Sequence, residues 1–349
     1  MIVLLLVFVS SIERAVMAFT TVGAVARGGA RRGLVGTSGF AKLRTDIAGG
    51  LFKFLILSAL LASLLILGVL LIDTIVSGWS QLSTRFWDFL NGSLRSRSID
   101  DRLGVQQGLY GSFWIGAIVA CTAFPIGVGA AIYLEEYALR SRLTATLELV
   151  IRNLAGVPSV VYGLLGLFLF VERNTIFGFI GLGWLVDATG GRSVLSAGLT
   201  LSVLVLPIVI ITAQEAVRAV PVQLKEGAYG LGATKSEMVR TQVLPYAAPG
   251  ILTGTLLAMS RAIGEAAPLI LVGAISGGLT NNPELWDASA LREKFTALPI
   301  IIVEWVSERG RDPGFADAAA AAIVVLLALV LLLNMTAILL RNYFERKRD

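Results

Sequence analysis

Apolar residues in this chain gather into long continuous runs, unlike the alternating or one-sided patterns of soluble domains. Six stretches are predominantly apolar, at residues 54–76, 110–134, 154–171, 194–213, 248–275 and 315–340. A helix of about 20 apolar residues crosses the roughly 30 Å of hydrocarbon in a bilayer. Because helices satisfy their own backbone polar groups, they are the element that such runs form in lipid. The pattern therefore predicts an all-α fold with six transmembrane helices.

Composition supports a lipid bilayer as the surroundings of this chain. Of its 349 residues 56% are hydrophobic and only 15% are charged. The formal charge of +5 does not indicate nucleic acid, because the basic residues are dispersed between the apolar spans. The chain has no histidine and a single cysteine, Cys121, which argues against metal sites and disulfides. We therefore predict no cofactor and no catalytic residue.

Charge between the spans predicts how the chain crosses the membrane. Most lysine and arginine residues fall on one side if both tails and the even-numbered gaps are cytoplasmic. Residues 1–50 are expected to be a basic cytoplasmic or interfacial leader, with a flexible linker over 27–50. Residues 51–349 form the predicted transmembrane domain. Beyond the fifth span, an apolar stretch at residues 297–306, opened by Pro299 and broken by Glu304, is expected to lie along the surface or cover a pathway mouth.

The predicted cytoplasmic loop at residues 214–247 has the local signals of two short helices. Pro221 suits a first helical position, and Gly230 and Gly232 permit a tight reversal. Thr234 and Glu237 have the spacing of a capping box that starts a second helix, which Pro245 is expected to end. Lys235 and Ser236 do not form a phosphate-binding P-loop, because the spacing of the preceding glycines is wrong.

This loop resembles the EAA motif of bacterial ABC importer permeases. The motif positions are occupied by Glu226, Gly227, Ala228, Gly232, Leu244 and Pro245. Two positions depart from the pattern, since Gly227 replaces the central alanine and Gln242 replaces an apolar residue. In that family the first helix inserts into a groove on the ATP-hydrolysing subunit. The resemblance therefore implies a coupling role for this loop, with local packing as the alternative, and places ATP hydrolysis in a partner.

Three further segments resemble the phosphate permease family PstA. They read PIGVGAAIYLEEYA at 125–138, NLAGVPSVVYGL at 153–164 and SRAIGEAAP at 260–268. The related PstC family shares weaker versions of these segments. The resemblance covers about residues 105–345 and implies the type I ABC importer permease fold, with import of inorganic phosphate. It also implies three kinds of partner, namely a PstC-like permease, two PstB-like ATP-binding subunits and a PstS-like extracytoplasmic phosphate-binding protein.

Two charges stand inside the fifth predicted span. An unpaired charge at that depth costs at least about 2.5 kcal/mol on insertion scales. Arg261 and Glu265 are four residues apart, so they are expected to share a helix face and pair. One interpretation is a structural ion pair. The other is a substrate pathway in which Arg261 offers planar donors to phosphate oxygens and Glu265 orients it or competes with the anion.

For the other polar residues at the spans, a structural role is favoured over a functional one. Arg152 and Asn153 open the third span ahead of Gly156 and Pro158, so they either start the helix or belong to a pathway with loosened backbone. Glu135 and Glu136 are interpreted as solvated charges at the end of the second span. Asn334 in the sixth span is expected to link helices by hydrogen bonding.

Three classes of protein remain open at this point. An ATP-driven importer permease is favoured by the loop, with sulfate, molybdate or phosphonate as alternative substrates to phosphate. An ion-gradient-driven carrier would use Arg261 and Glu265 as a relay, although no internal repeat supports it. A scaffold without transport is disfavoured by the charged fifth span.

Overall fold

The computed structural model describes residues 38–346 except 96, 99–101, 140, 174–182, 276, 278, 280–282 and 284–285. The leader predicted at residues 1–50 therefore lies mostly outside the described residues. The chain divides into two compact units, residues 1–69 and 70–349. In the first unit helix α2 begins at Ser38 and continues into the second unit as far as Asn91. Residues 38–50 are thus helical where a flexible linker was expected, although Gly49 and Gly50 stand directly before the apolar span.

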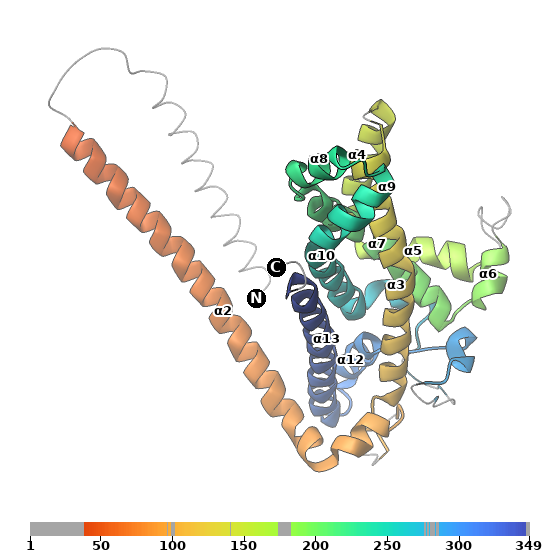
Figure 1. Ribbon diagram of the computed structural model, residues 1–349. Coiled ribbons are helices and arrows are strands. Elements are labelled where there is room, and N and C mark those ends of the chain that lie inside the picture. The colour runs from red at the N-terminus through yellow and green to blue at the C-terminus, as the bar shows by residue number, and fades with distance from the viewer. Residues whose placement is uncertain are drawn as a thin grey trace. The chain divides into compact units, whose positions relative to one another are not determined.

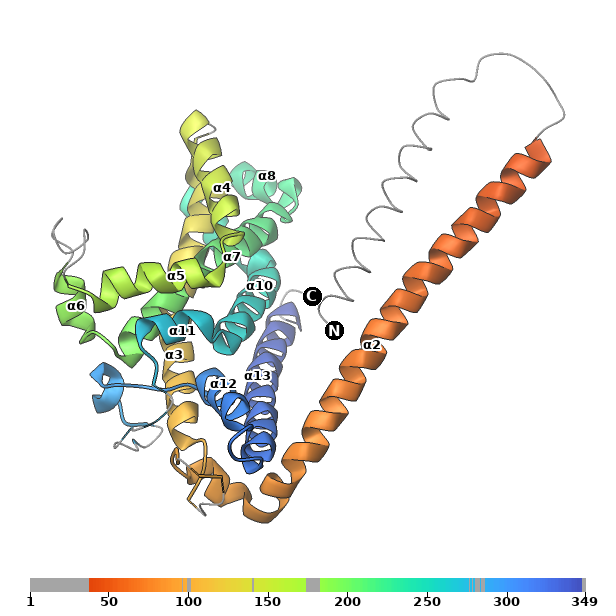
Figure 2. The same cartoon turned by 180° about the vertical axis from the view of Figure 1, so that it is seen from behind.

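Helices make up the second unit, and the described residues contain no named β-strand. Four long helices run side by side, α3 (Gln106–Ile132), α7 (Val194–Arg218), α10 (Leu244–Gly264) and α13 (Gly314–Arg346), as Figures 1 and 2 show. Shorter elements connect them, namely η1 (Tyr133–Tyr137), α4 (Arg142–Ala155), α5 (Ser159–Gly166), η2 (Leu167–Val171), α6 (Trp184–Thr189), α8 (Val222–Gly230), α9 (Lys235–Met238), η4 (Val239–Val243), α11 (Ala267–Val272), η5 (Ser289–Arg292) and α12 (Leu298–Glu308).

Five described helices are long and apolar enough to cross a membrane. The count rises to six if the bent pair of residues 142–155 and 159–171 is one span. This confirms the predicted all-α fold with six spans. The third span differs from a simple helix, because its two parts meet at 102°. Gly156 caps the end of α4 and Pro158 stands before α5, so the sequence itself supplies the break.

Apolar clusters hold the second unit together. The largest joins α3, α7, α10 and α11 around fully buried side chains such as Val119, Leu201 and Leu269. A second cluster includes Phe89 of α2, Trp305 of α12 and Phe315 of α13. The stretch expected to lie along the surface is therefore helix α12, with Leu298, Ile301 and Trp305 buried. Glu304, which interrupts the apolar stretch, lies within this helix and is partly exposed.

Candidate functional site

The loop between α7 and α10 folds as a helix, a glycine corner and a second helix. Helix α8 ends at Gly230, and Gly232 adopts a φ of 83°, a left-handed conformation that favours glycine. Thr234 and Glu237 form the predicted capping box, in which the Glu237 backbone N–H donates to Thr234 Oγ1 and the Thr234 N–H donates to Glu237 Oε2 at 2.8 Å. The reversal predicted from Gly232 and the capping box are both confirmed.

The two prolines of this loop do not act as expected. Pro221 precedes α8 as its N-cap residue, one position before the helix. Pro245 does not end the second helix, because α9, η4 and α10 continue as one apolar element over Lys235–Gly264. Pro245 lies in the first positions of α10, directly after the π-helical turn η4. Inside this continuous element the missing N–H of Pro245 removes one helical hydrogen bond, and the π-helical turn directly before it is the irregular part of the helix that accommodates the proline.

Residues of the EAA-like motif divide between two faces of α8. Glu226 and Gly227 are exposed, whereas Ala228 is only 8% exposed and packs in an apolar cluster with Met238 and Val243. Beyond the motif alanine, Tyr229 and Leu231 are exposed, the latter by 92%. The cluster beneath the loop fixes it on α7 and α10. The exposed face therefore carries Glu226 together with apolar side chains that water does not favour.

Two spans are interrupted, and their shorter parts pack against each other. Helix α10 ends at Gly264, Glu265 has extended backbone angles, and α11 starts at Ala267. Helix α11 contacts α5, the second half of the other broken span. In Figure 2 both α5 and α11 lie across the direction of the long helices. A methyl group at Gly163 of α5 would lie 2.7 Å from the Cα atom of Pro268, so glycine permits this close approach.

Arg261 and Glu265 form the ion pair that the sequence predicts. Arg261 Nε donates to Glu265 Oε1 at 3.3 Å, with the arginine side chain 49% and the glutamate side chain 19% exposed. The expectation of one continuous helix is wrong, since Glu265 follows the last helical residue. The pair therefore stands at a helix break, where backbone N–H and C=O groups lack helical partners. Broken helices of this kind form substrate sites in membrane transporters.

Arg152 and Asn153 lie at the other break. They do not open a helix as predicted, because they form the last turn of α4, before Gly156. Both side chains are exposed, and the Asn153 carbonyl accepts a hydrogen bond from the Gly156 N–H at 3.1 Å. The described contacts join Arg261 to Glu265, and none of them joins this pair to Arg152 or Asn153.

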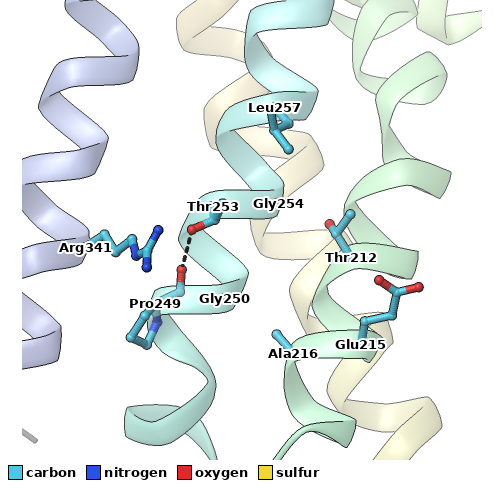
Figure 3. A pocket seen from close by; sticks show the side chains of 9 residues that line it. All are labelled: Thr212, Glu215, Ala216, Pro249, Gly250, Thr253, Gly254, Leu257 and Arg341. Atoms are coloured by element: carbon cyan, nitrogen blue, oxygen red, sulfur yellow. Dashed lines mark hydrogen bonds between the residues drawn. The ribbon is translucent and has the colours of Figure 1, made fainter. Parts of the chain in front are cut away.

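A cavity of about 460 Å³ lies along α10, one helical turn from Arg261. Figure 3 shows Thr212 and Glu215 on α7, Thr253 and Leu257 on α10, and Arg341 reaching from α13 toward α10. Leu257 precedes Arg261 by four residues and is exposed on the same face. Thr253 is the polar side chain that α10 contributes to the cavity, and the charged groups Glu215 and Arg341 come from α7 and α13. Sequence reasoning missed the cavity, because single threonines in apolar runs carry no signal of their own.

Asn334 links two spans as expected. Ser260 of α10 donates a hydrogen bond to Asn334 Oδ1 of α13 at 2.7 Å. Because the serine directly precedes Arg261, this contact also fixes the helix that carries the ion pair.

Glu135 and Glu136 are ion-paired, so their interpretation as solvated end charges was wrong. Glu135 pairs with Arg218 at the end of α7, and Glu136 pairs with Lys225 of α8. The Glu136 side chain is only 7% exposed. Arg218 and Lys225 belong to the predicted loop at residues 214–247, which was assigned to the cytoplasmic side together with Glu135 and Glu136. This shared side is the sequence feature that could have indicated the pairing.

Comparison with known proteins agrees with this architecture. Residues 123–349 match the family described as "Binding-protein-dependent transport system inner membrane component". The chain therefore belongs to this family of membrane components, and it is a multi-pass permease of the ABC importer class. A solved bacterial ABC transporter that imports alginate has the same fold, with a TM-score of 0.50, 15% identity and coverage of 85% of this chain and 98% of that chain.

Three relatives carry names of transporter permeases, and two of these names concern phosphate. The Bacillus subtilis "Probable ABC transporter permease protein YqgI" is 30% identical, covering 85% of this chain and 94% of its own. "Phosphate transport system permease protein PstC" of Mesorhizobium japonicum is 31% identical, with 66% and 73% covered. "Phosphate transport system permease protein PstA" of Mycobacterium leprae is 32% identical, with 67% and 70% covered. The resemblance to phosphate permeases that the three sequence segments predict is thus confirmed.

Proposed function

We propose that this chain conducts inorganic phosphate across the cell membrane as one half of an ATP-driven importer. The observation that carries the proposal is the projecting loop of α8, Gly232 and α9. Its Glu226, Tyr229 and Leu231 are exposed, while Ala228 anchors it to the bundle. An exposed, rigidly anchored helix suits insertion into a groove on a separate ATP-hydrolysing subunit. Both termini and this loop are then cytoplasmic, in line with the distribution of basic residues.

The other half of the pathway comes from a second, PstC-like permease. Two PstB-like ATPase subunits supply the energy, and a PstS-like binding protein delivers phosphate from outside. PstA-like and PstC-like relatives match this chain at 32% and 31% identity, so the assignment to the PstA position rests on the three segments named above.

Phosphate is the proposed substrate because of the resemblance to phosphate permeases, and the helix break supports an oxyanion by presenting a half-exposed arginine beside a carboxylate. The Arg261 guanidinium offers planar donors to a tetrahedral oxyanion, and exposure leaves it accessible from the pathway. Glu265 competes for the same donors, which keeps the anion bound weakly enough to leave. Arg152 and Asn153 at the second break are proposed to line the same pathway, a role supported by their position beside Gly156 and by their exposure.

Uptake into proteoliposomes that contain the assembled complex tests this proposal. Labelled phosphate should enter only with ATP on the side of the loop, excess sulfate should not compete, and a protonophore should have no direct effect. Uptake that follows the proton gradient without ATP would indicate a secondary carrier instead. Competition by sulfate or molybdate would keep the importer and change its substrate. The Arg261→Gln variant should lose most uptake while inserting normally, whereas normal uptake would remove Arg261 from the pathway.

A further inference from the structure

The turn η1, which continues α3, contacts three elements of the loop region through three consecutive residues. Glu135 pairs with Arg218, the last residue of α7, and Glu136 pairs with Lys225 of α8. The ring of Tyr137 lies 5.2 Å from Lys235 Nζ, at the first residue of α9. Consecutive residues of a helical turn point in different directions, so three in a row can reach three neighbouring elements. Here they reach the entry to the loop, its first helix and its second helix.

The local backbone at this point differs from the rest of α3. Residues Tyr133–Tyr137 form a π-helical turn, and the chain leaves it at Ala138 with extended angles. Turns of this kind occur often at functional positions in helices. Helix α3 itself packs along α7 and α10, the core of the bundle. Movement of α8 can therefore reach α3 directly through these polar contacts, and through α3 it can reach α7 and α10.

The three contacts are not equal. Glu136 is 7% and Lys225 22% exposed, whereas Arg218 of the neighbouring pair is 52% exposed. A shielded ion pair is little screened by salt, and removal of one partner leaves the other charge without compensation. The pair of Glu136 and Lys225 is therefore the contact most able to hold α8 in one position relative to α3.

We propose that Glu136 and Lys225 are positioning residues that transmit movement of the coupling helix α8 to α3. This inference rests on the proposed function and deepens it, because it names where the loop joins the transmembrane bundle. Without the pair, α8 would still pack on α9 and η4 through Ala228. The ATPase subunits would then still bind and hydrolyse ATP, and the transported amount per ATP would fall.

The test measures phosphate uptake and ATP hydrolysis together in the full complex in proteoliposomes. Glu136→Gln and Lys225→Gln should each lower phosphate transported per ATP by at least about fivefold, the lower end of typical coupling between sites. The exchanged variant Glu136→Lys/Lys225→Glu should recover most of the ratio. Lys225→Arg, which keeps the charge, should stay near the unsubstituted ratio. The matched control is Asp187→Asn, which removes an ion pair with Arg173 in which both side chains are more than half exposed.

Each outcome has one meaning. Suppose that the unsubstituted complex transports phosphate with ATP and that both Gln variants keep its ratio of phosphate transported per ATP. The role of the Glu136–Lys225 pair in coupling is then refuted, and the proposed function stands. If the unsubstituted complex shows no ATP-driven transport, the proposed function itself fails. If a Gln variant fails to assemble, an exchanged variant that assembles and couples transport to ATP still supports the coupling role of the pair. An exchanged variant that neither assembles nor couples overturns it.

Discussion

Adding one methyl group at Gly163 should disturb the contact between the two broken spans. The added carbon would lie 2.7 Å from Pro268 Cα and 2.8 Å from Leu271 Cδ1, whereas favourable carbon contacts lie at about 3.5–4.0 Å. Leu271 can rotate away, but the backbone at Pro268 cannot. Helices α5 and α11 must therefore separate by about 1 Å. Overpacking of this size costs about 1–3 kcal/mol.

Two measurements on the purified complex check this expectation. Gly163→Ala should lower the melting temperature and reduce phosphate uptake, because α11 begins directly after the Arg261–Glu265 pair. Gly129→Ala in α3 is the matched control, since a methyl group there meets no atom within 4 Å and the substitution favours the helix. If the two variants have the same melting temperature and the same phosphate uptake, the close packing of α5 on α11 contributes to neither stability nor transport.

Four other substitutions test separate parts of the structure. Asn334→Ala removes the hydrogen bond from Ser260 and should destabilise the bundle by about 0.6 kcal/mol, measured by thermal unfolding in detergent; an equal effect in a Ser260→Ala background would show that the bond is not its cause. Gly227→Ala should leave uptake unchanged or raised, because α8 is open there and alanine favours a helix by about 1 kcal/mol. Gly232→Ala should lower uptake, because its φ of 83° costs a side-chain residue about 1–2 kcal/mol, and equal uptake by these two variants would refute the glycine corner. Hydrogen bonds from Ser98 lower the pKa of Asp312, so they stabilise the fold at pH values above the ordinary aspartate pKa. Ser98→Ala should therefore be less stable than the unsubstituted protein at pH 7, and this loss of stability should shrink as pH falls below about 4. A loss of stability that does not vary with pH would contradict this.

Sequence patterns predict the spans well and the breaks poorly. Long apolar runs specify helices regardless of their neighbours, so the spans at α3, α7 and α13 lie where hydropathy places them. The capping box of Thr234 and Glu237 is equally local, and it forms as predicted. The end of α10 at Gly264 also has a local signal, because glycine and a following proline such as Pro268 commonly end a helix, but the long apolar run was interpreted as one continuous span.

Charged residues show the same division between local and tertiary information. The pairing of Arg261 with Glu265 follows from a spacing of four residues, and it survives the helix break. Glu136 and Lys225 are 89 residues apart, so only the fold brings them together. Periodicity indicates only which residues of a single helix share a face. For this reason Glu135 and Glu136 were interpreted as solvated charges.

Crosslinking from the tip of the loop tests the central claim most directly. A single cysteine at Leu231, introduced with Cys121→Ala, stands on a side chain that is 92% exposed. In membranes that contain all partners it should crosslink to a nucleotide-hydrolysing subunit, and an impermeant thiol reagent should not label it from outside. A cysteine at the exposed Trp286, beyond the opposite ends of the spans, should be labelled from outside. Labelling of the Leu231 position from outside, or no crosslink in a complex that copurifies, would contradict the account.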